Sequence, residues 1–393
     1  MIQLIKKKLG GRVNRIQVKR DGRVQASGAS SGGRPATVAL ALLSVLLLSD
    51  LGQAEVCAQL QGSLGGARPK NSVVRAGTGV LSSFYGPNLV SLPGKGAGDF
   101  ASYRQVRLLQ WNVENHFPQK DAKELMALSQ LMKNESPELI LVQEVDQAST
   151  MEDFQKKYLQ SSYRVLLIDG NDGRGIDSGL YVKNDFPLIV EAQSFKNLAD
   201  SDGPIFRRDA ITFVFRNPSS GLPLFALVGV HLKSMRDVPG DPQGTRQRAR
   251  EVLGLGLVYQ EIQKAFGSQF PVLISGDFNN EVSTAPEFDP LRNWGFRDAL
   301  DLVQYPSPRH THFYFTPMGR KLHRSFLQLD STQVDLSAQK MQLIQDARVL
   351  PQMDDRGQWL KDPQTMAEKK AAGRPSDHKA SLIVLDASKI QSP

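Results

Sequence analysis

The apolar residues of this chain fall mainly into short runs separated by polar and glycine-rich segments, a pattern typical of buried β-strands. Two longer segments, 121–134 and 247–266, place apolar residues at helical spacing, and Asp121 stands where it can cap the first helix. The closely spaced runs 210–215 and 224–230 predict a hairpin. Further strands are expected at 108–111, 138–143, 163–168, 178–182, 270–274 and 381–385. Such alternation predicts an α/β fold with mixed or antiparallel sheets.

Polar residues stand at the ends of five of these runs. They are Asn112, Glu144, His231, the pair Asp277 and Asn279, and the pair Asp377 and His378. Each one alone has an ordinary structural interpretation, since Asp and Asn close turns with their own side chains and a lone His is often structural. Together they predict one site at the strand ends. A carboxylate at the mouth of a buried strand lies in a low-dielectric cleft, where it can hold a metal ion or position a nucleophile.

The motifs around these residues resemble the signature set of a known superfamily. Segments 111–115, 143–145, 230–234, 276–279 and 376–378 are similar to those of the endonuclease/exonuclease/phosphatase superfamily, the deoxyribonuclease I-like proteins. Weaker similarities lie at 293–299 and 328–330, and the resemblance extends from about residue 107 to 386. It implies a four-layer α/β sandwich, in which two packed mixed or antiparallel sheets have helices outside.

The resemblance also implies a metal site. Glu144 would be the main metal ligand, with Asn112 beside it and Asp377 near the metal. The expected ion is Mg²⁺ or Mn²⁺, because Mg²⁺ is usually held by one or two carboxylates and keeps several waters. A hard divalent cation neutralises charge on phosphoryl oxygens, which hydrolysis of a phosphate ester requires.

The resemblance further assigns catalytic roles. Asp277 would orient or deprotonate the attacking water, and Asn279 would hold a phosphoryl oxygen. His378 would contact the phosphate with its ring oriented by a carboxylate. That carboxylate is best matched by Asp330, because Gln-Leu precedes it, with Asp335 as the alternative.

Two further residues are expected near the phosphate. By resemblance, His231 would donate to the phosphate as its charge develops. Arg208 precedes a predicted strand at a place where family members often hold a phosphate-facing arginine, and it is the weaker candidate. The arginines of 236–250 have two interpretations: a solvated loop that enters a helix, or a rim that meets substrate phosphates.

These features predict a metal-dependent hydrolase of phosphate esters, with a phosphodiesterase or endonuclease as the favoured activity. A phosphomonoesterase and a sphingomyelinase-like lipid phosphodiesterase are the alternatives. An inositol phosphatase is disfavoured because Asn280 and Glu281 follow the Gly-Asp-Phe-Asn motif, and no apolar hairpin for membrane entry is apparent. A catalytically inactive binding module is disfavoured because the site residues are retained. The expected partner is a phosphate-ester substrate, with nucleic acid one candidate, and we expect a monomer without a stable protein partner.

Most of the net positive charge of the chain lies in its N-terminal part. Residues 1–58 hold nine basic and three acidic residues, so they contribute +6 of the net charge of +8. The remainder has no broad electrostatic footprint for a polyanion. A basic stretch and the charge-free run 36–48, followed by small residues at Ala54 and Ala58, predict a signal peptide over 1–58. The alternative is an uncleaved membrane anchor formed by 36–48.

These observations divide the chain into three parts. The segment 59–100 is rich in Gly, Ser and Pro and is expected to be a linker or lead-in, and 101–388 is expected to be the catalytic domain. Cys57 is the only cysteine, which excludes an internal disulfide and a multi-cysteine zinc site. We expect an exported protein, periplasmic or extracellular, and the resemblance indicates a secreted bacterial member.

Overall fold

The computed structural model describes the short strands β1 (Ile16–Val18) and β2 (Val24–Ala26) and then residues 89–94, 100–114, 117–318, 321–369 and 373–390. Side chains are described in these later ranges except at 101, 314–318 and 321–326. The chain divides into two compact units, 1–70 and 71–393. In the first unit β1 and β2 pair antiparallel. The expected apolar run 36–48 and the small residues after it lie outside the described residues.

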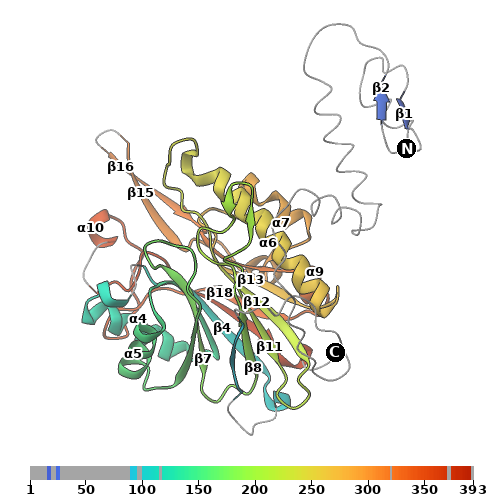
Figure 1. Ribbon diagram of the computed structural model, residues 1–393. Coiled ribbons are helices and arrows are strands. Elements are labelled where there is room, and N and C mark those ends of the chain that lie inside the picture. Colours follow the sequence, from blue (N-terminus) through green and yellow to red (C-terminus); the bar gives the residue numbers. More distant parts are fainter. Residues whose placement is uncertain are drawn as a thin grey trace. The chain divides into compact units, whose positions relative to one another are not determined.

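The larger unit contains two mixed sheets (Figure 1). The seven-stranded sheet has the order β14 (Arg297–Asp298), β17 (Asp330–Val334), β13 (Val272–Asp277), β12 (Pro223–His231), β11 (Ile211–Arg216), β8 (Ile189–Gln193), β3 (Leu89–Leu92). The six-stranded sheet has the order β18 (Ile344–Val349), β19 (Ser381–Asp386), β4 (Gln105–Asn112), β5 (Leu139–Val145), β7 (Asp177–Lys183), β6 (Tyr163–Leu167).

Each sheet has one parallel pair near its centre. β4 is parallel to β5, and β12 is parallel to β13, whereas the other neighbours are antiparallel. The carboxyl ends of parallel strands meet at the same edge of a sheet. In each sheet, the polar residues at the ends of the two parallel strands therefore lie at the same edge.

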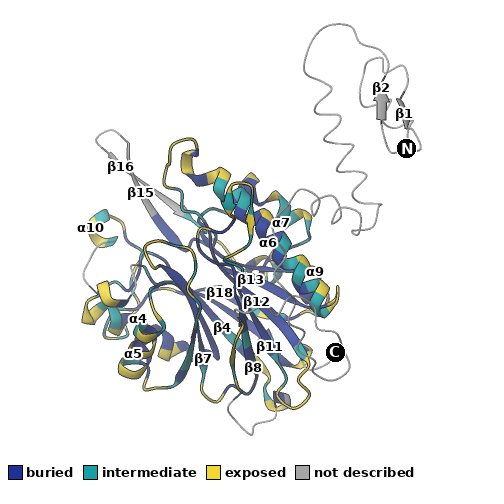
Figure 2. Cartoon of the chain, in the orientation of Figure 1, coloured by how far each residue is buried: buried dark blue, intermediate teal, exposed yellow. Residues whose placement is uncertain are grey.

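Three hydrophobic clusters show that the unit has four layers. Successive side chains of a strand point to opposite faces, so Leu108 belongs to the core between the sheets and Leu109 to the core on the outer face. Helices α4 (Ala122–Glu135) and α5 (Ala148–Tyr158) cover the outer face of the six-stranded sheet. Helix α6 (Thr245–Phe266) and α7 (Asp289–Asn293) cover the other sheet. Figure 2 shows buried strands between partly exposed helices, and the four-layer prediction is confirmed.

The two helices expected from spacing are present. α4 begins at Ala122, and Asp121 accepts hydrogen bonds from the backbone N–H groups of Lys123 and Glu124. The Glu124 carboxylate in turn accepts from the backbone N–H of Asp121, which completes a capping box. α6 begins two residues before the predicted start.

Several elements were not predicted. They include α5, a hairpin of β15 (His312–Met318) and β16 (Lys321–Leu327), and the small helices α8 (Ala299–Leu302), α9 (Leu336–Lys340), α10 (Met366–Lys369) and α11 (Ala387–Ile390). The strand β3 lies within the segment expected to be a linker and pairs with β8 at the sheet edge. In the described part of the chain, no helix combines the length and the apolar character needed to cross a membrane.

Candidate active site

The polar ends of the two parallel pairs meet where the sheets pack together. Asn112, at the end of β4, donates from Nδ2 to Asp277 Oδ2 of β13 at 3.0 Å, and both side chains are almost fully buried. This bond joins the six-stranded sheet to the seven-stranded sheet. The strand ends that the sequence marked as polar therefore form one site rather than separate turns.

His231 ends β12 opposite Asp277 in the strand register. Its Nε2 lies 3.5 Å from Asp277 Oδ2 and 3.9 Å from Glu144 Oε1. Burial, together with the nearby charges of Arg208 and His378, holds the pKa of His231 well below its usual value. The ring is therefore neutral near pH 7 and retains one N–H group that can donate.

The backbone around Asp277 holds the carboxylate in place. Gly276 has φ of 145°, and a Cβ atom there would lie 2.0 Å from the carbonyl oxygen of Val230, so only glycine fits between the strands. Asn279 has φ of 56°, and its backbone N–H donates to Asp277 Oδ1 at 2.8 Å. Its Nδ2 donates to Leu232 O at 2.9 Å and lies 3.2 Å from Asp277 Oδ2. Turn chemistry and site geometry therefore coincide here.

His378 is paired with a buried carboxylate. Its Nδ1 lies 2.7 Å from Asp330 Oδ2, and its Nε2 lies 4.0 Å from Asp277 Oδ2. Burial alone would lower the pKa of His378, but the carboxylates of Asp330, Asp377 and Asp277 outweigh it and raise the pKa well above its usual value. The ring is therefore an imidazolium at neutral pH.

The structure places Asp330, and not Asp335, against His378. Asp330 opens β17 directly opposite Asp277, and its Oδ1 accepts from Gln110 Nε2 at 2.9 Å. Asp335 instead caps α9 by accepting from the backbone N–H of Ala338 at 2.9 Å. The two aspartates that the sequence left open thus have separate structural roles.

Glu144 has a strained backbone. Its φ is 63°, a left-handed value, and it lies at a shift in the register between β5 and β7. Its Oε1 lies 3.5 Å from Asn112 Nδ2, and the side chain is partly exposed. A bulge that re-aims a carboxylate at a strand end beside an amide suits a hard-cation site, because both side chains offer oxygen ligands.

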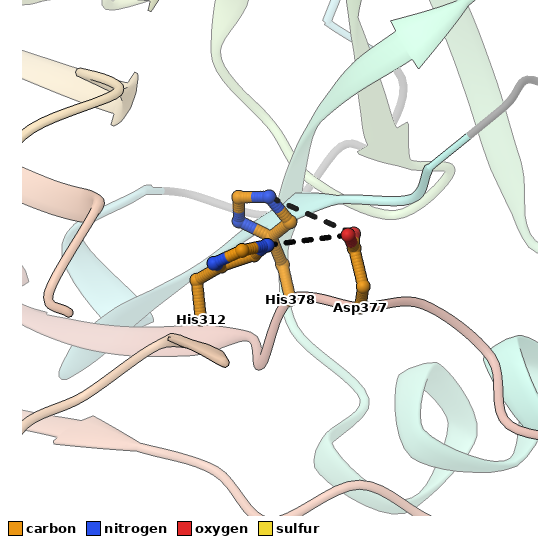
Figure 3. A group of neighbouring side chains, drawn as sticks. All are labelled: His312, Asp377 and His378. Atoms are coloured by element: carbon orange, nitrogen blue, oxygen red, sulfur yellow. Dashed lines mark hydrogen bonds and ion pairs between the residues drawn. The ribbon is translucent and has the colours of Figure 1, made fainter. Parts of the chain in front are cut away.

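Asp377 faces Nε2 of the His378 ring (Figure 3), whereas Asp330 contacts Nδ1. Its Oδ2 accepts from His312 Nε2 at 3.2 Å and pairs with Lys369 Nζ at 3.2 Å, and its Oδ1 lies 3.7 Å from His378 Nε2. Burial alone would raise the pKa of Asp377, but the hydrogen bond from His312 and the charges of His378 and Lys369 hold it well below its usual range. Of the three expected metal ligands, Asn112 and Glu144 contact each other, whereas Asp377 contacts imidazoles and a lysine.

Arg208 points into the protein. Its guanidinium donates from Nη1 to the backbone carbonyls of Leu232 at 2.8 Å and His231 at 3.3 Å, and its Nε lies 3.2 Å from Asp172 Oδ2. These contacts fix the segment that follows β12. They make Arg208 a support for His231, and contact with a substrate phosphate stays a prediction.

Two arginines of the 236–250 segment also have structural contacts. Arg248 is fully buried and bonds Glu287 Oε1 from Nη2 at 2.7 Å, and Arg250 pairs with Asp200. Arg246 remains largely exposed. Arg248 and Arg250 lie within α6, so the interpretation as a solvated loop does not describe them, and contact of this segment with substrate phosphates stays a prediction.

Several site residues were missed. Glu114 accepts from the backbone N–H of Asp377 at 2.8 Å, and burial followed by repulsion from Asp377 raises the pKa of Glu114. An acidic residue two places after Asn112, within a motif already noted, was an available signal. Gln110 shares a face with Asn112 and is a polar residue inside an apolar run, which was also visible. His312 and Lys369 come from elements that the sequence did not predict.

Comparison with known proteins covers nearly the whole of this site. A model of the endonuclease/exonuclease/phosphatase family matches residues 109–378. Among solved structures, the human nocturnin catalytic domain with bound sulfate is 18% identical, covers 76% of this chain and 95% of its own, and has a TM-score of 0.50. A truncated Caenorhabditis elegans TDP2 is 16% identical, with 72% and 98% covered and a TM-score of 0.48.

A third similar structure is the mannosyl-6-phosphatase of Bacteroides thetaiotaomicron VPI-5482, which is 15% identical, with 71% of this chain and 99% of its own covered and a TM-score of 0.48. Among curated protein sequences, none matches the chain. At these identities the likeness to nocturnin shows a shared fold and does not indicate a substrate.

Proposed function

The chain belongs to the endonuclease/exonuclease/phosphatase family, and on that premise we propose that it is a divalent-metal-dependent phosphodiesterase, with nuclease activity as the favoured form. Hydrolysis of phosphoesters is the general chemistry that family membership supports. The observation that carries the proposal is the buried cluster in which Asp277 lies within reach of both a neutral His231 and a charged His378. A carboxylate that can act as a base, Asp277, beside a charged imidazolium, His378, suits attack of water on a phosphate.

Asp277 is proposed to orient the attacking water and to take its proton. Burial raises the pKa of Asp277 to about 7, which is near the value at which a general base works best at neutral pH. Asn279 would exchange its contact with Asp277 for one with a phosphoryl oxygen. His378, held as an imidazolium by Asp330, would contact the phosphate, and His231 would donate its N–H as negative charge develops.

Asn112 and Glu144 are proposed to hold the metal ion, Mg²⁺ or Mn²⁺. An amide and a carboxylate offer the oxygen donors that hard divalent cations prefer. The two side chains lie side by side at the edge of the six-stranded sheet, where Asn112 Nδ2 is 3.5 Å from Glu144 Oε1 and Asn112 Oδ1 accepts from the backbone N–H of Glu114. When bound, the ion would neutralise charge on the phosphoryl oxygens. The Asp377 carboxylate already has His312 and Lys369 as partners, and we propose that it lies beside the metal site rather than supplying its main ligand.

We expect Asp330→Asn to lower kcat by about 10²-fold, because an amide cannot hold the His378 imidazolium by charge. Asp335→Asn is the matched control, since Asn caps a helix about as well as Asp and should leave kcat unchanged. Steady-state rates with a generic phosphodiester and thermal melts of both variants check this. Equal losses in the two variants would show that the Asp330–His378 contact has no role of its own.

The substrate class is tested with the purified chain without residues 1–58. Duplex DNA, RNA, bis-p-nitrophenyl phosphate, p-nitrophenyl phosphate and sphingomyelin vesicles would each be assayed with Mg²⁺ and with excess chelator. Cleavage of nucleic acid and of the generic diester supports the proposal. Cleavage of the monoester alone or of the lipid alone would replace it with the phosphomonoesterase or lipid alternative. No cleavage of any substrate would favour a binding module. The expected hydrodynamic size is that of a monomer.

We also propose that the enzyme is exported and acts in the periplasm or outside the cell. The basic leader, the apolar run 36–48 and the small residues after it are the support for this. N-terminal sequencing of protein from the envelope or medium should find a start just after Ala54 or Ala58. Recovery of protein with residue 1 intact in the membrane fraction would indicate the anchor, and recovery in the cytoplasm would contradict export.

A further inference from the structure

The ammonium group of Lys369 lies among polar groups next to Asp377, the carboxylate that faces Nε2 of His378. Its Nζ lies 2.8 Å from the backbone carbonyl of Phe313, 3.2 Å from Asp377 Oδ2 and 3.4 Å from His312 Nε2. These groups come from three places in the sequence: α10, the start of β15 and the loop before β19. The lysine side chain is only 15% exposed. An ammonium has three N–H donors; Phe313 O and Asp377 Oδ2 accept two of them, and the third faces His312 Nε2, a nitrogen that itself donates to Asp377.

The acceptors of this lysine also belong to a group with the chemistry of a metal site. Ligand atoms of His312, Asp377 and His378 all lie within 4.8 Å of one another. Figure 3 shows that both imidazole rings are directed toward the Asp377 carboxylate. Two imidazoles and a carboxylate are donors of the kind that bind Zn²⁺ or Mn²⁺. The carbonyl oxygen of Phe313 beside them is a further donor.

A lysine ammonium and a divalent ion cannot both use these acceptors. The two cations repel each other strongly at contact distance inside a protein. The tether of Lys369 to the chain gives it the advantage of a very high local concentration. The backbone bridge between His312 and His378 holds the acceptors together independently of the lysine, so their arrangement does not require the ammonium to be present.

We propose that Lys369 is a built-in cation that takes the place of a second divalent ion at His312, Asp377 and His378. The enzyme then works with a single ion, at Asn112 and Glu144; this inference rests on the proposed function, which supplies that first ion. The consequence is chemical. An ion at the second position would be held by the two imidazole rings and the carboxylate, whereas Lys369 neutralises Asp377 through an ion pair and leaves both rings uncoordinated.

The test counts bound ions. Mn²⁺ is titrated into the purified wild-type protein and variants, with isothermal titration calorimetry as the readout. Lys369→Met keeps the length of the side chain and removes its charge. We expect one ion for the wild type, two for Lys369→Met, and one again for the double variant Lys369→Met/His312→Ala. Lys156→Met is the matched control, because Lys156 is 57% exposed on α5 and its loss changes net charge equally.

The outcomes separate the inference from the proposed function. Two ions in the wild type would overturn the inference and leave metal dependence intact. One ion in a folded Lys369→Met protein, or two in Lys156→Met, would also overturn it. No ion in the wild type would remove the proposed function and the inference with it. If Lys369→Met does not fold, Lys369→Gln replaces it, and if neither folds the wild-type count decides, with one ion in support and two against.

Discussion

Asp277→Ala is expected to lower kcat by at least about 10²-fold, the scale of losing one acid–base or electrostatic group. The carboxylate lies at the end of β13, where Asn112, Asn279 and His231 all contact or approach it. A missing side chain there leaves the water without a base. The same scale of loss is expected for His378→Ala and Glu144→Ala. A folded Asp277→Ala protein with near wild-type turnover would show that the role assigned to Asp277 is wrong.

The pH dependence of the wild-type rate gives this prediction a direction. A base acts only when it has lost its proton, and burial raises the pKa of Asp277 to about 7. The rate should therefore rise as the pH increases through about 7 and level off above it. Rates with a generic phosphodiester between pH 5 and 9 check this. The control is Asp335→Asn, which should keep the full profile because Asp335 only caps α9 and bonds Tyr259.

Stability should move in the opposite direction to activity. A carboxyl whose pKa is raised on folding binds its proton more tightly in the folded state. The contribution of Asp277 to the free energy of unfolding therefore falls as the pH rises from the pKa of the carboxyl in the unfolded chain to its pKa of about 7 in the folded protein. Above pH 7 the buried charge of Asp277 therefore costs stability. Loss of activity in Asp277→Ala without a matching fall in melting temperature at pH 8 would show that the effect is catalytic.

The layers of the fold could be predicted because the information is local. A run such as 108–111 has apolar residues on both faces, Leu108 on one and Leu109 and Trp111 on the other, which marks a strand buried between a sheet and helices. Asp121 identifies the start of α4 from the sequence alone. The polar residues that follow these runs could be grouped into one site because parallel strands end at a common edge.

Other elements lacked such local information. α5 follows Gln147, which makes no capping bond, and it buries only Met151, Phe154 and Gln155. Without a cap or a long apolar stripe, a short helix is not distinguished from a loop. The β15–β16 hairpin contains Pro317, which argues against a strand in a sequence pattern but is tolerated in an isolated two-stranded ribbon.

The contacts that complete the site depend on tertiary structure. Glu114 reaches the backbone of Asp377 across 263 residues, from a backbone with φ of 52°. His312 and Lys369 meet at Asp377 from two segments that have no common motif. The choice of Asp330 over Asp335 had only the preceding Gln-Leu as support in the sequence, because both flank the same short strand. Its physical basis is the strand register that places Asp330 opposite Asp277.

Removal of divalent cations is expected to abolish activity, with less than about 1% remaining in excess chelator. The proposed ligands Asn112 and Glu144, which lie side by side, can offer only a few oxygens, so waters and substrate oxygens would be needed to complete the coordination of a hard cation. Such a site binds its ion weakly, so chelation should be rapid and reversible. Mg²⁺ or Mn²⁺ should restore the rate, and Na⁺ or K⁺ at equal ionic strength should not.

Two controls make the metal experiment decisive. Chelator already saturated with Mg²⁺ should leave the rate unchanged, which excludes a direct effect of the chelator on the protein. Glu144→Ala should bind Mn²⁺ at least about tenfold more weakly than the wild type while Asp335→Asn binds it normally, since Glu144 is the proposed carboxylate ligand and Asp335 caps α9. Full turnover by the wild type in excess chelator would contradict metal dependence. Charge on the phosphoryl oxygens would then be stabilised by protein groups such as the His378 imidazolium and the N–H of His231.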